Sequence, residues 1–176
     1  MDNDLENTEK KVMIKQKELT KIEKFINEKD NKAYVLMEYQ DPDNILTENN
    51  MKLLLVSLSE SIFSKKATTG EIDVIGKENV VQGVAMVSTL EDIDSYIKEK
   101  TNHEIVIDKI KSAFSSRLNN QLGLYYYVVS PSNDSKYEIK NGYKIGNDYY
   151  ITLKNKSELI LNYANDRFYF RSHVSK

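Results

Sequence analysis

The sequence predicts a single α+β domain in which helices pack on an antiparallel sheet, and the main part of that sheet is C-terminal. Segments 148–153, 158–163 and 167–172 alternate apolar and polar residues, which is typical of strands with one buried face. Upstream, apolar residues recur at helical spacing, as in 4–28 and 48–64. Hydrophobic residues make up 40% of the chain and charged residues 30%, which is enough apolar material for a folded core.

The first element is predicted to be a long helix over 4–28. Its apolar positions recur every seven residues, as one helical face requires: Leu5, Val12, Leu19 and Ile26. The heptad positions between them are polar, so we do not expect a sustained coiled coil. We expect residues 1–30 to form a helical spacer and residues 31–176 to form one α+β globular domain. The helix is also a possible contact between two copies of the chain.

The middle of the chain is predicted to mix helices with short strands. Thr47 can cap a helix over 48–64. Ser88 or Thr89 is expected to begin another helix, and Glu91 lies where the capping-box partner of Ser88 would be. The first of these helices is expected to bury one face: Met51, Leu54, Leu55, Leu58 and Ile62. We also expect a strand at 33–39, paired strands at 71–75 and 80–87, a short strand or turn at 104–107, and a helix at 108–118. Gly83 interrupts the run 80–87, so a helix is the alternative there.

The C-terminal third is predicted to be a Tyr-rich series of antiparallel strands. Segment 124–130 is apolar on both alternating sets, as in a strand covered on both faces. Asn141-Gly142 lies between 137–140 and 143–145 and predicts a tight hairpin turn. One alternating set of the last three strands is expected to face the core: Tyr149, Ile151, Leu153, Leu159, Leu161, Tyr163, Phe168 and Phe170.

The opposite alternating set predicts an aromatic face flanked by cations. Tyr and Arg are frequent anchor residues of protein interfaces, so this face is our candidate binding site. The candidate binding residues are Tyr150, Lys154, Ile160, Arg167, Tyr169 and Arg171, with Thr152 and Asn162 on the same side. The alternative is that a helix covers this face, or that these residues are ordinary strand formers on a solvated sheet.

Catalytic and metal-binding chemistry finds little support in the residue pattern. The chain has no Cys, which excludes thiolate zinc sites, disulfides and Cys nucleophiles. The two histidines, His103 and His173, have no further ligands or nucleophile at a suitable spacing. No glycine-rich phosphate-binding motif occurs. We therefore expect no enzyme activity, no metal and no cofactor. A net charge of -2 argues against a dedicated nucleic-acid binder.

The cellular setting is an expectation from composition and from the N-terminal sequence. No apolar run approaches the roughly 20 residues that cross a bilayer, and the polar start lacks the features of a signal peptide. Met1 is either a native start or follows a removed signal or anchor. Heavy use of Asn, Ile, Lys and Tyr, whose codons are AT-rich, points to a low-GC bacterium or its phage. We lean towards an extracytoplasmic, surface-anchored protein, with the cytoplasm as the alternative.

The expected order of elements resembles known layouts. A long first helix followed by an antiparallel sheet is similar in layout to the soluble portion of type IV pilin-like proteins. The helices packed on a curved sheet also resemble cystatin-like and NTF2-like proteins. The resemblance is one of layout and involves no family motif.

These observations favour a non-enzymatic binding or interaction module that uses the aromatic and basic sheet face. Its partner is expected to be another protein or a cell-envelope polymer, and the edge strand 167–172 could add to a partner's sheet. One alternative is a cytoplasmic phage or mobile-element protein that inhibits another protein. A second is a small-ligand carrier or enzyme with a pocket between helices and sheet, near 125–127 and His103.

Overall fold

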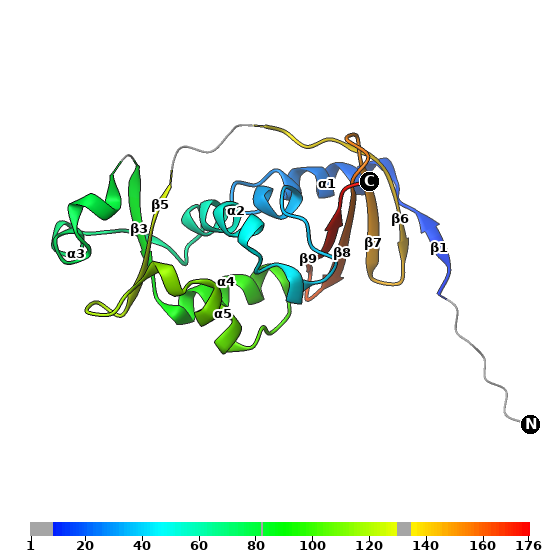
Figure 1. Ribbon diagram of the computed structural model, residues 1–176. Coiled ribbons are helices and arrows are strands. Elements are labelled where there is room, and N and C mark those ends of the chain that lie inside the picture. The colour runs from blue at the N-terminus through cyan, green and yellow to red at the C-terminus, as the bar shows by residue number, and fades with distance from the viewer. Residues whose placement is uncertain (1–8, 82, 130–134) are drawn as a thin grey trace, which may run out of the picture.

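The computed structural model describes residues 9–81, 83–129 and 135–176. Within these residues the chain contains five α-helices and two antiparallel sheets, so the predicted α+β class is confirmed. The larger sheet lies at one end of an elongated molecule, the helices occupy the middle, and the smaller sheet lies at the other end (Figure 1). No helix of the described part is long and apolar enough to cross a bilayer.

The larger sheet is built mainly from the C-terminal third, as predicted. In spatial order its strands are β1 (Lys11–Met13), β6 (Ile139–Ile145), β7 (Asp148–Leu153), β8 (Glu158–Ala164) and β9 (Arg167–Val174). Each strand from β6 to β9 pairs with its neighbour in sequence. This meander places β7 in the centre and leaves β1 and β9 as the two edges.

The predicted hairpin at Asn141-Gly142 is wrong, because β6 runs straight through both residues. Gly142 pairs with Ile151 inside the sheet, and the connection to β7 comes later, between the pair Ile145 and Asp148. A Cβ atom at Gly142 would lie 2.8 Å from the Ile151 Cδ1 and 3.0 Å from the Ile14 Cδ1. The glycine therefore allows two core side chains to approach the strand, and it does not make a turn.

The predicted N-terminal helix over 4–28 is also wrong in its first half. The helix α1 spans only Gln16–Ile26, and Lys11–Met13 forms strand β1 instead. Residues 4–8 of the predicted helix lie outside the described residues. In α1 the side chains of Leu19, Ile22 and Ile26 are buried in the protein's own core. The division of the chain at residue 30 stays a prediction, although β1 and α1 both contact β6.

The middle of the chain is more helical than predicted. Its elements are 3₁₀ helices η1 (Lys32–Val35), η2 (Pro42–Asn44), η3 (Lys77–Val80) and η4 (Ser115–Arg117), and helices α2 (Glu48–Ser59), α3 (Thr69–Ile75), α4 (Leu90–Thr101) and α5 (Ile107–Ala113). The predicted strands at 33–39 and 71–75 are therefore wrong. Thr47 caps α2 as predicted, accepting a bond from the Asn50 amide. The α2 helix ends early, so Ile62 is 89% exposed and not buried.

The smaller sheet joins segments that are distant in sequence. Its spatial order is β2 (Lys65–Lys66), β3 (Val84–Ser88), β5 (Leu124–Val129) and β4 (Leu118–Asn119). The strand predicted at 124–130 is thus present, but it belongs to this second sheet; Ser130 lies outside the described residues. The strand predicted at 80–87 starts later, at Val84, and Gln82 lies outside the described residues.

One hydrophobic core connects the larger sheet to the helices. The inner face of the sheet packs against α1 and η1, with Phe170 stacked on Phe25 at 5.3 Å and on Tyr34 at 4.7 Å between ring centroids. Most of the predicted inward set is buried: Tyr149, Ile151, Leu153, Leu159, Leu161 and Phe170. Phe168 is half-buried, and Tyr163 is 36% exposed at the rim of this face.

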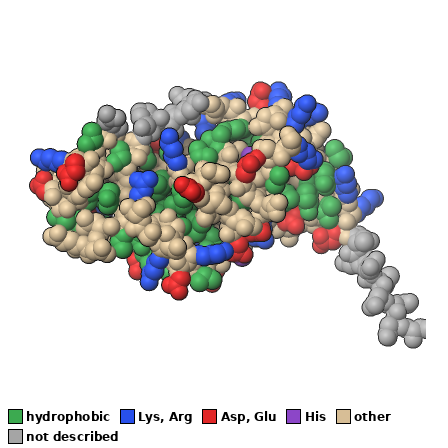
Figure 2. Space-filling view, in the orientation of Figure 1, with side chains coloured by type: hydrophobic (Ala, Val, Ile, Leu, Met, Phe, Trp, Pro, Cys, Tyr) green, Lys and Arg blue, Asp and Glu red, His purple; other side chains and the backbone are tan. Residues whose placement is uncertain are grey.

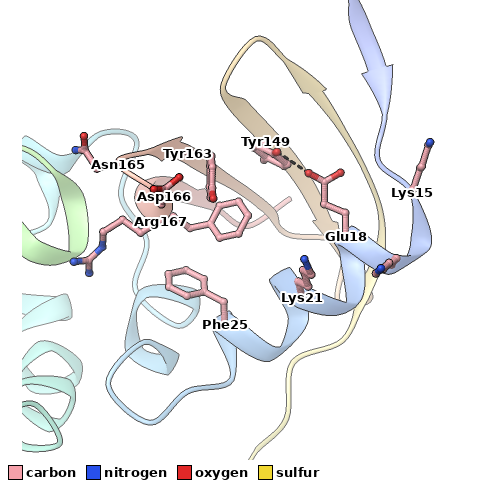
Figure 3. Close-up of a pocket in the computed structure, with 11 residues that line it drawn as sticks. Lys15, Glu18, Lys21, Phe25, Tyr149, Tyr163, Asn165, Asp166 and Arg167 are labelled. Atoms are coloured by element: carbon pink, nitrogen blue, oxygen red, sulfur yellow. Dashed lines mark hydrogen bonds between the residues drawn. The ribbon is translucent and has the colours of Figure 1, made fainter.

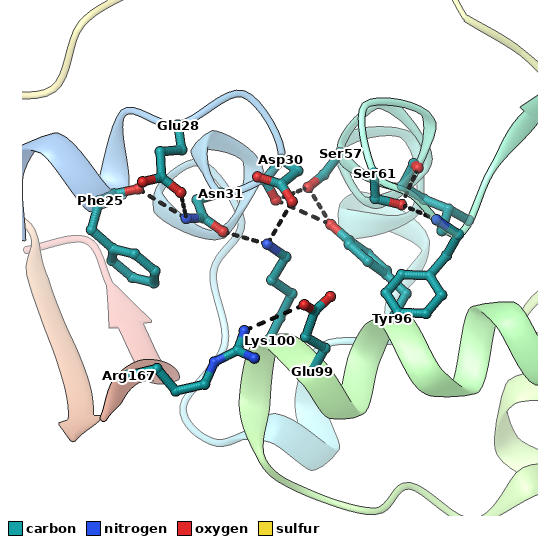
Figure 4. Close-up of polar contacts among 12 residues, drawn as sticks. Phe25, Glu28, Asp30, Asn31, Ser57, Ser61, Tyr96, Glu99, Lys100 and Arg167 are labelled. Atoms are coloured by element: carbon teal, nitrogen blue, oxygen red, sulfur yellow. Dashed lines mark hydrogen bonds and ion pairs between the residues drawn. The ribbon is translucent and has the colours of Figure 1, made fainter. Parts of the chain in front are cut away.

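A buried polar cluster joins the turn between α1 and η1 to α2 and α4 (Figure 4). The Lys100 ammonium on α4 donates to the Asp30 carboxylate and to the Asn31 side-chain oxygen, both at 2.7 Å. The Asp30 carbonyl accepts bonds from the Ser57 hydroxyl and, at 3.3 Å, from the Tyr96 hydroxyl. Because Lys100 is only 6% exposed, its two bonds replace its hydration, and the whole cluster fixes α2 and α4 relative to the turn after α1.

Candidate functional site

The outer face of the larger sheet carries a row of large side chains across three adjacent strands. Tyr143 on β6 is the register partner of Tyr150 on β7, and Tyr150 is the partner of Ile160 on β8. The two tyrosine rings stack nearly parallel, at 5° and 4.9 Å between centroids. Cross-strand aromatic pairs of this kind hold their side chains in fixed positions on the sheet surface.

Strand β1 extends this row to the edge of the sheet. Met13 is the register partner of Tyr143, and its side chain is 63% exposed. Lys11 lies two residues earlier on the same face, and its ammonium is 3.9 Å from the centroid of the Tyr143 ring. This cation–π contact places a positive charge directly on the aromatic row. We call the set Lys11, Met13, Tyr143, Tyr150 and Ile160 the aromatic row.

The aromatic row lies outside the hydrophobic core. None of its members belongs to the buried core cluster or to the hydrophobic residues that pack against that cluster. Tyr143, Tyr150 and Ile160 are half-buried by their neighbours in the sheet. Figure 2 shows hydrophobic side chains gathered at the end of the molecule where β1, β6 and β7 lie, with Lys and Arg around them.

A second, more polar row runs beside the aromatic row on the same face. Ile145 pairs with Asp148, and Asp148 pairs with Asn162, whose amide donates to its carboxylate at 2.8 Å. A flat apolar strip next to an ordered polar strip is the composition usual for the core and rim of a protein interface.

The aromatic row contains only two of the predicted binding residues, Tyr150 and Ile160. Lys154 follows the end of β7, where its ammonium lies 3.2 Å from the Glu138 carboxylate. Arg171 sits at a register shift in β9, because Phe170 pairs with Leu161 while Ser172 pairs with Ile160. This bulge takes Arg171 out of the cross-strand register of the row.

Arg167 and Tyr169 lie at the β9 edge, away from the aromatic row. The Arg167 guanidinium is 3.5 Å from the Glu99 carboxylate of α4 and 5.2 Å from the Tyr169 ring. Tyr169 is only 6% exposed, so its ring offers little surface to a partner. The β9 edge is also occupied near its end, because Tyr39 and His173 exchange both backbone bonds there, at 3.0 and 2.9 Å.

Three members of the aromatic row were missed from the sequence. Tyr143 was placed after a turn, and Lys11 and Met13 were placed in a helix. A bulge in β6 between Ile139 and Asn141 puts Ile139 opposite the buried Leu153 and Tyr143 opposite Tyr150, so no continuous alternation in the sequence marks Tyr143. The pairing of β1 with β6 joins residues more than a hundred positions apart, and nothing local in the sequence encodes it.

The two histidines have structural partners. His173 is buried, and its Nδ1 donates to the Met37 carbonyl at 2.7 Å while its Nε2 lies 2.9 Å from the Ser157 hydroxyl. Burial lowers the pKa of His173 below its ordinary value of 6.5, which favours the neutral ring. His103 lies 3.0 Å from the Asp43 carboxylate at the surface.

The region proposed for an internal pocket, near 125–127 and His103, holds two separate groups of contacts. The Tyr127 hydroxyl is buried and meets the hydroxyls of Ser64 and Ser88. Tyr125 packs edge-on against Phe114 at 6.2 Å. His103 makes its contact with Asp43 instead. Across 9–81, 83–129 and 135–176, no group of three or more acidic or His side chains is placed to hold a metal ion.

Comparison with known proteins finds no match of the sequence to a family model, to a curated protein or to a solved structure. The assignment of function therefore rests on the geometry of the surface.

Proposed function

We propose that this protein is a non-enzymatic binding module that contacts a protein partner through the aromatic row on the outer face of its larger sheet. The observation that carries the proposal is the stacked pair Tyr143 and Tyr150, which lies on an open sheet face together with Lys11. Natural monomers seldom leave contiguous large apolar side chains on a surface without a use for them.

The aromatic row has the features of an interface anchor. Tyrosine rings supply a large contact area while having few rotatable bonds to immobilise. The stacking of Tyr143 on Tyr150 restricts both rings before any partner arrives, which lowers the entropic cost of binding. Lys11 on the Tyr143 ring favours a partner with a carboxylate next to an apolar patch. This charge preference supports a protein partner over an uncharged polymer.

The test is a capture experiment with matched surface variants. The double variant Tyr143→Ser with Tyr150→Ser removes both rings from the aromatic row. The control is Ile62→Ser with Val106→Ser, which removes two exposed apolar side chains of 89% and 68% exposure from other parts of the surface. Each protein is immobilised and exposed separately to cell-envelope and cytosolic fractions, and circular dichroism and thermal unfolding verify that both variants fold.

We expect a partner that the wild type and the control capture and that the aromatic-row variant does not. Capture from the envelope fraction would support the extracytoplasmic setting, and capture from the cytosol would support a cytoplasmic inhibitor acting through the same face. A partner retained equally by the folded aromatic-row variant would refute the proposal.

A further inference from the structure

A groove separate from the aromatic row lies between α1 and the rim of the sheet's inner face (Figure 3). Its volume is about 1000 Å³, at the upper end of the range usual for small-molecule sites. Residues from α1 and Lys15 just before it form one wall. Residues from β7, β8, β9 and the turn between β8 and β9 form the other. The groove therefore opens on the opposite side of the sheet from Tyr143 and Tyr150.

The sheet side of the groove is aromatic. Phe168 lies at its centre, with Tyr163 at 5.0 Å, Tyr149 at 5.2 Å and Phe25 at 5.6 Å between ring centroids. Tyr163 is 36% exposed, so its ring presents surface to the groove, whereas Tyr149 is nearly buried. An exposed ring backed by packed rings is a surface on which a flat ligand can stack.

A tight turn holds this aromatic wall in place. Asn165 and Asp166 connect β8 to β9 with positive φ values of 52° and 59°, the left-handed conformation that Asn and Asp tolerate best. Ala164 and Arg167 close the turn as a register pair. Tyr163 and Phe168 are the next pair, so the turn sets the position of both rings.

The helix side of the groove is cationic. Lys17 and Lys21 stand one turn apart on α1, and Lys15 precedes the helix. The Lys21 ammonium points towards the space between the helix and the rings (Figure 3). Within the part of the chain that the structure describes, none of these three lysines lies within 4.0 Å of a carboxylate. Among the described residues, no carboxylate neutralises these three ammonium groups, so their charges favour an anionic ligand.

Other charged groups of the groove are already engaged. Glu18 accepts a bond from the Tyr149 hydroxyl at 2.7 Å and lies 3.6 Å from the Lys144 ammonium. Arg167 pairs with Glu99. Asp166 remains as an acidic group at the turn. The excess charge of the groove is therefore positive, and it is concentrated on the helix side.

We propose that this groove binds a small planar anion, an aromatic or heteroaromatic ring that carries a phosphate. The ring would stack on Tyr163, and the phosphate would meet Lys17 and Lys21. Lysine ammonium groups suit a phosphate because they act as compact charges with freely rotating donors. The start of α1 adds a favourable dipole for an anion on the same side.

The test uses adenosine monophosphate as the probe, with adenosine and inorganic phosphate as the two halves of its chemistry. Isothermal titration measures affinity on the full chain, and amide chemical shifts locate the site. We expect saturable binding of adenosine monophosphate, at least about tenfold tighter than either half, because stacking and charge each contribute. Shifts are expected at Lys17, Lys21, Tyr163 and Phe168.

Matched variants separate this site from general electrostatics. The variant Lys17→Gln with Lys21→Gln is expected to weaken binding about tenfold. The variant Lys109→Gln with Lys111→Gln makes the same charge change on α5 and is expected to leave affinity within about twofold. Tyr163→Ser removes the stacking ring. It is expected to weaken the binding of adenosine monophosphate and to leave the affinity for inorganic phosphate unchanged.

Three results would overturn the proposal. They are no saturable binding of adenosine monophosphate, shifts confined to residues away from the groove, and equal weakening by the α1 and α5 variants. Because the groove and the aromatic row share no residue, failure here leaves the proposed binding module intact, and failure of partner capture leaves the groove intact.

Discussion

Replacing Lys100 by Met tests the buried polar cluster that holds the helices together. Methionine keeps an unbranched apolar side chain that reaches as far as the lysine Cε, with sulfur in place of one methylene, and it lacks the ammonium. The perturbation therefore deletes two hydrogen bonds of 2.7 Å, one to Asp30 and one to Asn31. It leaves the volume of the core almost unchanged, so a cavity does not complicate the result.

The expected loss follows from the burial of the groups left behind. The Asp30 side chain is 30% exposed and can regain water, whereas Asn31 is 1% exposed and its side-chain oxygen cannot. Breaking a buried ion pair from one side costs about 3–5 kcal/mol, and the partial exposure of Asp30 favours the low end, about 3 kcal/mol. At about 2–4 °C per kcal/mol for a chain of this size, Tm falls by about 6–12 °C.

Lys98→Met is the matched control on the same helix. Lys98 makes an equally short contact with Glu104, at 2.6 Å, but both side chains are more than half exposed. Exposed pairs contribute little, so we expect the control to unfold like the wild type. Urea unfolding and calorimetry provide the measurement. A Lys100→Met protein as stable as the Lys98→Met protein would refute the view that the buried cluster stabilises the fold.

The remaining predictions concern buried tyrosines and a histidine. Tyr34 is fully buried, and among the described residues its hydroxyl finds no hydrogen-bond partner, so Tyr34→Phe is expected to leave stability unchanged or raise it by about 1 kcal/mol in urea unfolding. Tyr39→Phe removes the 2.9 Å bond to the Tyr34 carbonyl and is expected to lower the free energy of unfolding by about 1 kcal/mol. A Tyr34→Phe protein that is less stable than the Tyr39→Phe protein would contradict this assignment of the two hydroxyls. The pKa of His173 is depressed by burial, so as pH falls below its ordinary value of 6.5 the unfolded chain binds a proton before the folded chain does, and stability declines. Between pH 7.5 and pH 5.5 the wild type is expected to lose more stability than His173→Gln, and equal losses would show that His173 does not carry the effect.

The parts of the fold that the sequence predicted well have local signals. Alternation over 148–153, 158–163 and 167–172 is strict, and the structure has β7, β8 and β9 there. Thr47 has the side chain and the position of a helix cap, and the helix begins at Glu48. A local pattern was sufficient in β7, β8 and α2 because one face of each is more deeply buried than the other. In β9 both faces are largely buried, and only its position was predicted.

Two errors came from signals that were present but misassigned. Segment 71–75 was predicted as a strand, yet Thr68 and Glu71 form a capping box, which marks a helix start. Of the two starts predicted for α4, Thr89 is correct, but the capping box predicted for Ser88 and Glu91 is one residue too early, because Thr89 pairs with Asp92. Asp has a shorter side chain than the usual Glu in this role, which made the correct box harder to identify.

Other errors could not be avoided from local sequence, because distant residues decide the conformation of these segments. Segment 33–39 contains Tyr34, Val35 and Met37 and reads as a buried strand, but it is compacted into η1 and the turn that follows. Its burial comes from Phe170 and other distant residues, so tertiary packing decides its conformation over local propensity. For the same reason, only part of the aromatic row was predicted from the sequence. Tyr150 and Ile160 follow from alternation, whereas Lys11 and Met13 join them only through the long-range pairing of β1 with β6.

The central claim is that the aromatic row is the contact surface for a partner, and hydroxyl-radical footprinting tests it most directly. The side chains of Met13, Tyr143 and Tyr150 are oxidised in the free protein and in the captured complex, with Ile62 and Val106 as internal references. The account predicts that the complex protects Met13, Tyr143 and Tyr150 while oxidation of the two references stays the same. Unchanged oxidation of Met13 and Tyr143 in a complex that protects another surface would contradict it.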